Sequence, residues 1–250
     1  MWFTEAAVGA GIYGLVAGAL VPALIARIPE PETAEAAQTD ADLPSEGEPA
    51  GPPEAATAKE RYRDIAARRG LRWQAVLATG AVSALVGGSL GWQASLVIFL
   101  YLAPVGVALA VVDWRTRLLP TKLIAPSYAA VIVLAAFAAW TDGDWSPLLT
   151  AGWGWLVAGG TFFVLWFVYP RGMGYGDVRL SGVLGLALGY LGWGPLLTGV
   201  YAGFVVGGLG GLVLSLLRVV DRRAYPFGPF MLVGALVGVL VGPHVAAWYA

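Results

Sequence analysis

The chain has 250 residues, of which 58% are hydrophobic and only 12% are charged, and its formal net charge is −1. A soluble domain of this length carries about twice that share of charged residues, so the composition excludes an ordinary water-soluble protein. Because there is no cysteine and only one histidine, His244, the sequence also excludes a disulfide framework, a thiol nucleophile and a cysteine-built zinc site, and it disfavours histidine-based catalysis.

Apolar runs long enough to cross the hydrocarbon core of a bilayer recur along the chain. They predict an all-α, polytopic membrane protein with about eight transmembrane helices. The sixth run is short for a full crossing and is expected to take residues from the loop before it. The expected spans are 6–28, 72–89, 92–112, 122–140, 148–169, 178–192, 196–217 and 227–248.

One extended polar stretch, 29–71, separates a first helix at 1–28 from a seven-helix membrane core at 72–250. Its first part, 29–58, holds eight acidic residues, six prolines and no lysine or arginine, a composition that predicts a disordered linker. Its second part continues to the start of the core: residues 59–72 hold six basic and two acidic residues and predict a short helix along an anionic cytoplasmic surface.

With eight spans, every basic residue of the chain lies near one face of the membrane. The positive-inside rule makes this face cytoplasmic and places both termini outside. The 15 basic residues are Arg27, Lys59, Arg61, Arg63, Arg68, Arg69, Arg72, Arg115, Arg117, Lys122, Arg171, Arg179, Arg218, Arg222 and Arg223.

Two late spans carry glycines at every fourth position, which places the glycines of each span on one helix face. Small residues at this spacing allow helix backbones to approach closely in lipid, so these ladders predict helix packing and no chemistry. The ladders are Gly199, Gly203, Gly207 and Gly211 in one span, and Gly234, Gly238 and Gly242 in the other.

Three acidic residues remain near the cytoplasmic border once the linker region and the outer face are set aside: Asp113, Asp177 and Asp221. Asp221 precedes Arg222 and Arg223 and is most simply a surface charge that pairs locally. Asp113 ends one apolar run and Asp177 begins another, so both are expected on the same side at about the same depth.

Each of these two aspartates also has a structural explanation. Asp177 is a good N-cap for the helix that follows, which is worth roughly 1 kcal/mol, and Asp113 could pair with Arg115 or Arg117. Ionisable residues at this depth are nevertheless costly and usually functional. Two neighbouring carboxylates can share a proton, activate a water and protonate a leaving amide, so the pair could cleave an amide bond without a metal or a nucleophilic side chain.

Gly174 and Gly176 stand directly before Asp177. They permit an irregular backbone, or a positive φ, beside the carboxylate, against which an extended substrate strand could lie. Irregular backbone at membrane depth is tolerated where it lines a cavity, which favours a site that admits water at the cytoplasmic border.

Four segments resemble motifs of the type IV prepilin peptidases, the GxGD family of bacterial membrane aspartic proteases. GMGYGDVRL is similar to the GxGD motif, and VVDWRTRLLPTKLIAPS to the first aspartate motif. YPFGPFMLVGA resembles the C-terminal PFGP segment, and GLVAGALVPALIARIPE resembles a worn first-span motif. The resemblance covers nearly the whole chain outside 30–70.

The resemblance implies an enzyme of the bacterial inner membrane that cuts the leader from type IV prepilins or pilin-like secretion subunits at the cytoplasmic face. Asp113 and Asp177 carry over as the catalytic pair, and proteolysis needs no cofactor. Many members also methylate the new N-terminus with S-adenosylmethionine. On this reading either aspartate could be the base, and the helix N-terminus favours Asp177 as the ionised one.

The chain departs from the family pattern at two places. Many members carry two CxxC pairs that bind zinc in the first cytoplasmic loop, and this chain has no cysteine there, so no metal site is expected. The first-span motif usually reads Gly-Ser-Phe-Leu-Asn, whereas residues 18–22 are Gly-Ala-Leu-Val-Pro, which puts the methyltransferase activity in doubt.

Two other functions fit part of the pattern. A presenilin-like intramembrane protease shares the GxGD chemistry, but the PFGP segment is not expected in it. A proton-coupled transporter would use the aspartates as a relay, and it should show repeats or broken helices near the midplane of the membrane.

Overall fold

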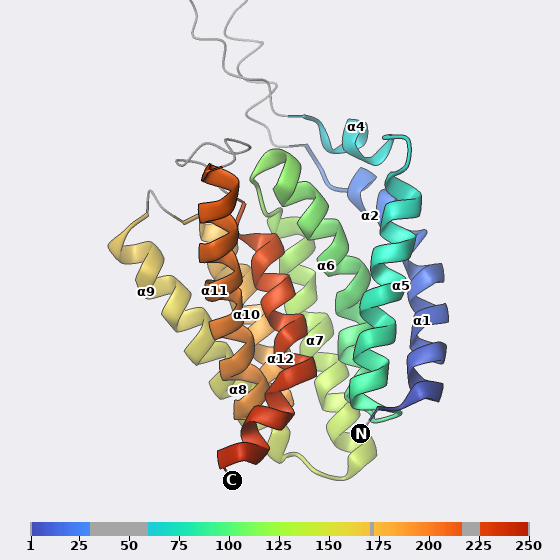
Figure 1. Ribbon diagram of the computed structural model, residues 1–250, viewed down its shortest axis with the longest axis vertical. Helices are drawn as coiled ribbons and strands as arrows, with labels where there is room; N and C mark the ends of the chain where they lie inside the picture. The colour runs from blue at the N-terminus through green and yellow to red at the C-terminus, as the bar shows by residue number, and fades with distance from the viewer. Residues whose placement is uncertain (1, 31–59, 171–172, 217–225, 250) are drawn as a thin grey trace, which may run out of the picture.

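The computed structural model describes residues 2–30, 60–170, 173–216 and 226–249. Within these ranges the secondary structure is helical throughout, with no strand. Figure 1 shows the long helices running side by side, with both ends of the chain at one end of the bundle and α4 at the other. The prediction of an all-α fold is confirmed.

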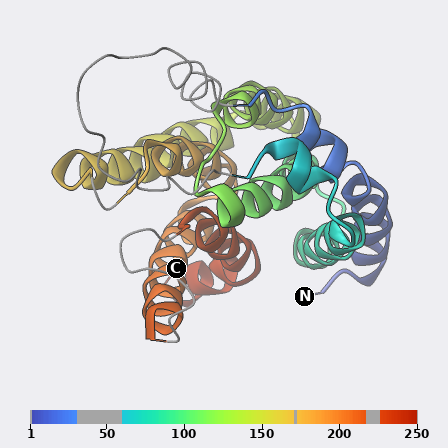
Figure 2. The same ribbon diagram turned by 90° about the horizontal axis from the view of Figure 1, so that it is seen from above.

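Six helices among the described residues are long and apolar enough to cross a membrane, which confirms a polytopic membrane protein. Seen from above, α1 and α5 form one pair at the edge of the bundle, α11 and α12 form another, and α6 lies between α5 and the rest (Figure 2). The spanning segments belong to α5 (Leu71–Leu90), α6 (Leu96–Thr116), α7 (Thr121–Asp142), the continuous α8 (Ser146–Gly154), η2 (Trp155–Gly159) and α9 (Gly160–Val168), α11 (Trp193–Leu216) and α12 (Gly228–Tyr249).

The first expected span, 6–28, is not one continuous helix. It is divided into α1 (Thr4–Gly18) and α2 (Val21–Ala26) by a turn at residues 19 and 20. Pro22 explains the break, because proline has no N–H to donate and its ring clashes with the carbonyl four residues earlier. The expectation of an unbroken first helix was therefore wrong.

The sixth expected span corresponds to α10 (Tyr175–Tyr190), which begins three residues earlier than the apolar run. At about 1.5 Å per residue its 16 residues reach roughly 24 Å, less than a hydrocarbon core of about 30 Å. Most of its residues are buried, because α7, α8, α9, α11 and α12 surround it. Protein rather than lipid covers this helix, so its length need not match the bilayer. The total of eight spans stays a prediction.

The basic segment contains a short helix, α4 (Tyr62–Ala66), which buries Tyr62 and Ile65 against the bundle. The carboxylate of Glu30 accepts hydrogen bonds from the backbone N–H groups of Tyr62 and Arg63, at 3.2 and 3.3 Å. A negative charge is favourable at the N-terminus of a helix. Glu30 therefore ties the end of the first helical segment to the start of α4.

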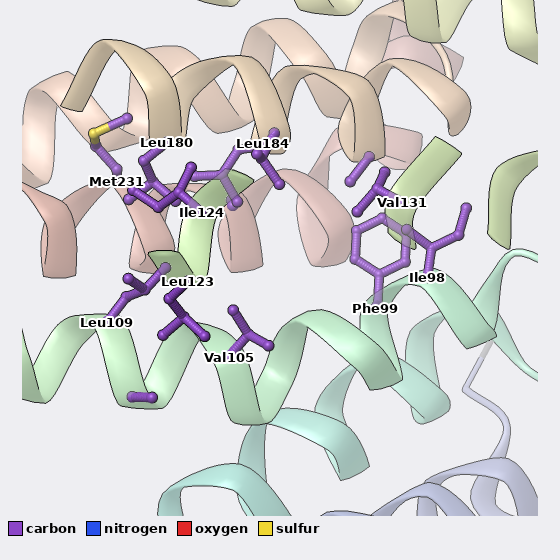
Figure 3. Packing of buried hydrophobic residues seen from close by; sticks show 14 of the residues in the cluster. Ile98, Phe99, Val105, Leu109, Leu123, Ile124, Val131, Leu180, Leu184 and Met231 are labelled. Atoms are coloured by element: carbon purple, nitrogen blue, oxygen red, sulfur yellow. The ribbon is translucent and has the colours of Figure 1, made fainter. Parts of the chain in front are cut away.

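The core lies between α6, α7, α10 and α12. Figure 3 shows Leu109, Ile124, Leu180 and Met231, one from each of these helices, gathered in one part of it. Lipid is as apolar as these side chains, so close packing stabilises the bundle more than removal from water does. This packing holds together the end of α6, the start of α7 and the starts of α10 and α12.

The glycine ladders pack as predicted. A Cβ at Gly234 would overlap the backbone of Gly203, and a Cβ at Gly238 would lie 2.8 Å from the Cα of Gly199. The backbones of α11 and α12 are therefore in direct contact over the first half of α11. Gly207 differs, because its nearest neighbour is the ring of Phe227.

Candidate active site

Asp113 lies in the last turn of α6 and is only 4% exposed. The helix ends three residues later, and its C-cap, Arg117, has a left-handed φ of 55°. The backbone N–H of Arg117 closes the turn by donating to the carbonyl of Asp113 at 2.8 Å. The end of α6 thus fixes the aspartate while the chain turns away toward α7.

The side chain of Asp113 is held from the far end of the sequence. Its Oδ2 accepts a hydrogen bond of 2.9 Å from the backbone N–H of Gly228, the first residue of α12. A Cβ on Gly228 would lie only 2.7 Å from that same oxygen. The PFGP segment therefore needs glycine at this position so that the backbone can reach the carboxylate.

Asp177 is the third residue of α10 and is 7% exposed. Its Oδ2 accepts a hydrogen bond of 3.1 Å from the backbone N–H of Gly174, and its own N–H donates to the Gly174 carbonyl at 3.0 Å. This is a capping box in which the third helical residue supplies a carboxylate, while the N-cap is a glycine and supplies only backbone atoms. The first turn of α10 therefore orients the side chain of Asp177.

Two expectations about this turn were wrong. The N-cap of α10 is Gly174, and Asp177 lies three residues into the helix. Gly176 lies inside the first helical turn, and neither it nor Gly174 has a positive φ. The backbone beside Asp177 is thus regular from Tyr175 onward. The sequence could not show this, because glycine is compatible with both conformations.

Gly176 is required for a close approach instead. A Cβ at this position would lie 2.7 Å from the Cβ of Leu119, in the turn between α6 and α7. The Cδ2 of Leu119 would in turn lie 3.3 Å from a Cβ on Gly228. One leucine therefore packs against the glycine next to Asp177 and against the glycine that holds Asp113. It brings the two aspartate-bearing segments together.

The structure brings the two predicted aspartates into one site. Their carboxylates are close enough for each charge to act on the other, and both are shielded from water by the surrounding helices. Each one uses Oδ2 to accept a single backbone hydrogen bond, and among the described residues neither Oδ1 has a partner. Asp221 lies outside the described residues.

Among the described residues, no arginine forms an ion pair with either aspartate. In the described part of the chain, neither Arg115 nor Arg117 forms an ion pair with Asp113, and the ion pair present joins Arg68 to Glu60. Arg179 turns outward, where its guanidinium lies 4.6 Å from the centre of the Tyr175 ring and donates a hydrogen bond to Thr121. Its role is to hold the start of α7 against α10.

An aromatic cluster fixes the segment that precedes Gly228. The ring of Phe227 lies 5.9 Å from Phe162 and 5.8 Å from Phe204, measured between ring centres, and these two rings stack on each other. Such pairs contribute about 0.5–1.5 kcal/mol each beyond burial. Phe227 thus positions the donor of the hydrogen bond to Asp113.

Reasoning from the residues missed three contributors to this site: Leu119, Phe227 and Gly228. Leu119 lies in the segment with the Leu-Pro pattern and Gly228 in the segment with the PFGP pattern, so the sequence did mark the segments to which both residues belong. Its meaning depends on contacts between residues more than 100 positions apart, which no local pattern reveals.

The described residues offer little to a metal ion or a methyl donor. Among them no three His, Cys, Asp or Glu side chains gather as metal ligands do. Residues 18–22, where the family motif has serine and asparagine, carry only apolar side chains or none. The backbone there packs against α5, since a Cβ on Gly18 would lie 2.6 Å from the carbonyl oxygen of Ala75. This segment therefore does not fit S-adenosylmethionine.

Comparison with known proteins places these features in a family. Residues 100–242 match the type IV leader peptidase family, a range that contains both aspartates, Gly174, Gly176 and Gly228. No solved structure matches the chain.

Relatives with assigned names agree. The chain is 30% identical over 184 residues to a prepilin leader peptidase/N-methyltransferase of Stutzerimonas stutzeri, which covers 69% of this chain and 59% of the relative. It is 32% identical over 203 residues to the protein of that name from Aeromonas salmonicida strain A449, covering 76% and 65%, and 31% identical over 150 residues to that of Escherichia coli K12, covering 57% and 61%. The chain thus spans about three fifths of the length of these relatives, and it belongs to the type IV leader peptidase family.

Proposed function

We propose that this protein is a membrane aspartic endopeptidase that removes the leader peptide from type IV prepilins or pilin-like secretion subunits. The observation that carries the proposal is the pair of buried aspartates, Asp113 and Asp177, each oriented by one backbone N–H and each acting electrostatically on the other. Family membership supports the same activity.

The pair works by sharing one proton. Burial disfavours the ionised form of both carboxyls, and the charge of one disfavours ionisation of the other as well, so one carboxyl is protonated while the other is ionised. The ionised carboxylate is the base and the protonated one is the acid. Each carboxylate accepts one backbone hydrogen bond through Oδ2, Asp113 at the end of α6 and Asp177 at the start of α10, and either one can act as the base.

Cleavage then proceeds without a covalent intermediate. The ionised aspartate takes a proton from a water molecule as the water oxygen attacks the carbonyl carbon of the scissile peptide. The protonated aspartate gives its proton to the carbonyl oxygen, which forms a neutral tetrahedral diol. As the diol collapses, one of its hydroxyl groups returns a proton to the aspartate that gave one, the C–N bond breaks, and the proton taken from water passes to the leaving amine, so the pair again shares one proton. The products are a free carboxyl group on the leader and a new N-terminus on the substrate.

Gly174 and Gly176 belong to the backbone of the site as positioning residues. Gly174 orients Asp177 through its N–H, and Gly176 admits Leu119 so that α10 can approach the end of α6. The N–H of Gly174 is already bonded to Asp177, so it is not free to bind an extended substrate. The substrate carbonyl would meet the Oδ1 atoms of the two aspartates, which have no partner among the described residues.

The proposed site faces the cytoplasm from a bacterial inner membrane. It lies where α6 ends and α10 and α12 begin, at the same end of the bundle as α4 and opposite the chain termini (Figure 1). The described basic residues gather in the segments at this end, which supports the cytoplasmic orientation by the positive-inside rule. Both termini are then outside. Methylation of the product is not part of the proposal, because residues 18–22 do not fit the methyl donor.

Co-expression with a candidate prepilin tests this function. We expect a mass decrease equal to the leader and a new N-terminus at the border of the apolar helix, measured by mass spectrometry of the intact substrate. Cleavage within the apolar helix would favour the presenilin-like alternative. Proton movement without cleavage, measured in vesicles with a pH-sensitive dye, would favour the transporter.

A further inference from the structure

One cleft in the described part of the molecule plays no role in the catalytic geometry. It runs along the bundle between α5, α6 and α12, and neither Asp113 nor Asp177 lines it. Its lower part, which is the part farther from α4, is almost wholly apolar and is lined by residues of these three helices and of α10. Its upper part opens beside α4. Val107, Ala110 and Pro229 line both parts, so the two form one continuous cleft.

The upper part of the cleft is basic. Arg68 and Arg69 reach it from the turn after α4, and Arg115 reaches it from the end of α6, beside the half-exposed Trp114. Arg68 is paired with Glu60 at 2.7 Å, whereas Arg69 and Arg115 have no acidic partner among the described residues. Two unpaired arginines from separate elements therefore face one cavity.

The length of the apolar part identifies its occupant. It extends along α6 from Ala110 to Phe99 and along α12 from Pro229 to Val239. At about 1.5 Å per residue these distances are roughly 15 to 17 Å. That is about half of a hydrocarbon core of about 30 Å, or one leaflet. A transmembrane helix of a substrate would need a groove about twice as long, whereas the acyl chain of a phospholipid needs only one leaflet.

We propose that this cleft binds an anionic phospholipid, with its phosphate between Arg69 and Arg115 and an acyl chain in the apolar groove between α5, α6 and α12. Basic pockets between membrane helices at the cytoplasmic side suit acidic head groups, and the apolar groove suits the chain attached to the same molecule. Pro229 lies directly after Gly228, the donor to Asp113. A bound lipid would therefore pack against the segment that positions the candidate site.

Lipid retention by the intact protein tests this proposal independently of peptidase activity. The protein is placed in nanodiscs of phosphatidylcholine with or without phosphatidylglycerol, then released, and its bound lipids are counted by native mass spectrometry. Each arginine near an anionic lipid changes affinity by about fivefold, so the double variant Arg69→Gln/Arg115→Gln should bind phosphatidylglycerol about 25-fold more weakly. The matched control, Arg63→Gln/Arg72→Gln, removes two charges from the same segment outside the cleft and should retain the lipid like the parent.

A second variant tests the apolar half. Ala110→Phe fills the junction between the two parts and leaves all arginines in place, so it should lower retention of phosphatidylglycerol as well. Normal retention by the Arg69→Gln/Arg115→Gln variant would overturn the proposal. Thermal unfolding adds a second measurement: if inorganic phosphate raises Tm as much as phosphatidylglycerol does, the proposal is overturned. It is also overturned if the Ala110→Phe variant keeps the lipid but no longer cleaves prepilin. The last result would assign the groove to the substrate chain.

Discussion

Glycines bring segments into contact in two regions of the molecule, and the atoms that they meet differ. Between α11 and α12, the neighbours of Gly234 and Gly238 are backbone atoms of the facing helix. Around the two aspartates, the neighbour of Gly228 is a carboxylate oxygen and the neighbour of Gly176 is the side chain of Leu119. In the first region glycine sets the distance between two helices, and in the second it sets the position of a candidate catalytic carboxylate or of the leucine beside it.

This difference predicts two kinds of damage. A methyl group between α11 and α12 separates two backbones and should cost stability, with little effect on the chemistry of the molecules that remain folded. A methyl group at Gly228 or Gly176 displaces an aspartate or the leucine beside it, and should cost cleavage with little loss of folded protein. The experiments below separate accumulation of the protein from the rate of leader removal.

The largest effect is expected for the aspartates themselves. Asp113→Asn or Asp177→Asn should each reduce leader cleavage by about 10³-fold or more, because one remaining carboxyl cannot supply both base and acid. The double variant should be no worse than either single one. Rates of leader removal at matched protein levels measure this. Asp64→Asn, at an exposed position of α4, is the control and should be neutral. Substantial cleavage by either single variant would refute the pair.

Gly228→Ala should come next, with a loss of about 100-fold in the rate of leader removal, since displacement of a catalytic group by about 1 Å can cost this much. The added Cβ would stand 2.7 Å from Oδ2 of Asp113 and would push the carboxylate away from its donor. The protein should still accumulate in the membrane. If the rate is normal, the hydrogen bond from Gly228 does not orient a catalytic carboxylate.

Gly176→Ala should slow cleavage by about tenfold, a smaller effect because Leu119 can shift to make room. Gly174→Ala should be milder still, because its Cβ would lie 3.3 Å from Oδ2 of Asp177, a tight contact that needs only a small adjustment. Ser181→Ala, a turn further along α10, is the control for this helix. Equal rates for Gly176→Ala and Ser181→Ala would show that the approach of Leu119 to α10 is irrelevant to the site.

The ladder should behave in the opposite way. Gly234→Ala should lower the free energy of unfolding by about 1–3 kcal/mol, as overpacking does, because its Cβ would overlap the backbone of Gly203. The cleavage rate per folded molecule should stay close to normal. Gly208→Ala is the matched control on α11, since no atom lies within 4 Å of its Cβ. Unfolding experiments measure the stability, and the rate of leader removal by the protein that remains folded measures the activity. A variant that folds normally but cannot cleave would erase the distinction between the two regions.

The comparison also explains how far the sequence could predict this protein. Hydropathy identified most helices, and glycine spacing identified the close packing of α11 and α12 but not that they pack against each other, because both signals are local and repeat along a helix. The two aspartates were found because charged residues are rare in such a chain. The contacts of Gly228 with Asp113 and of Leu119 with Gly176 join segments that are far apart in sequence, so no periodic pattern encodes them.

Local ambiguity accounts for the errors. Asp177 is acceptable both as an N-cap and as the third residue of a helix, and the choice depends on which N–H the carboxylate can reach. The break after Gly18 depends on Pro22, but an apolar run with one proline can also continue as a kinked helix. In both places the sequence allowed two structures, and packing against neighbouring helices selected one.

The smallest effect is expected from deletion of residues 33–56 in the acidic linker, which should leave accumulation and cleavage within about twofold of normal, because their composition cannot bury enough apolar surface to order the segment. The structure strengthens this expectation, since Glu30 bonds directly to the backbone of Tyr62 and Arg63. After the deletion, residues 31, 32 and 57–61 still connect Glu30 to Tyr62. Seven extended residues reach roughly 25 Å, far more than is needed between two residues that are hydrogen-bonded to each other.

Glu30→Ala in the shortened chain is the sharper companion variant, because it removes the hydrogen bonds at the start of α4 and should lower Tm more than the deletion does. Loss of cleavage by the shortened protein at normal abundance would mean that the linker takes part in binding the substrate.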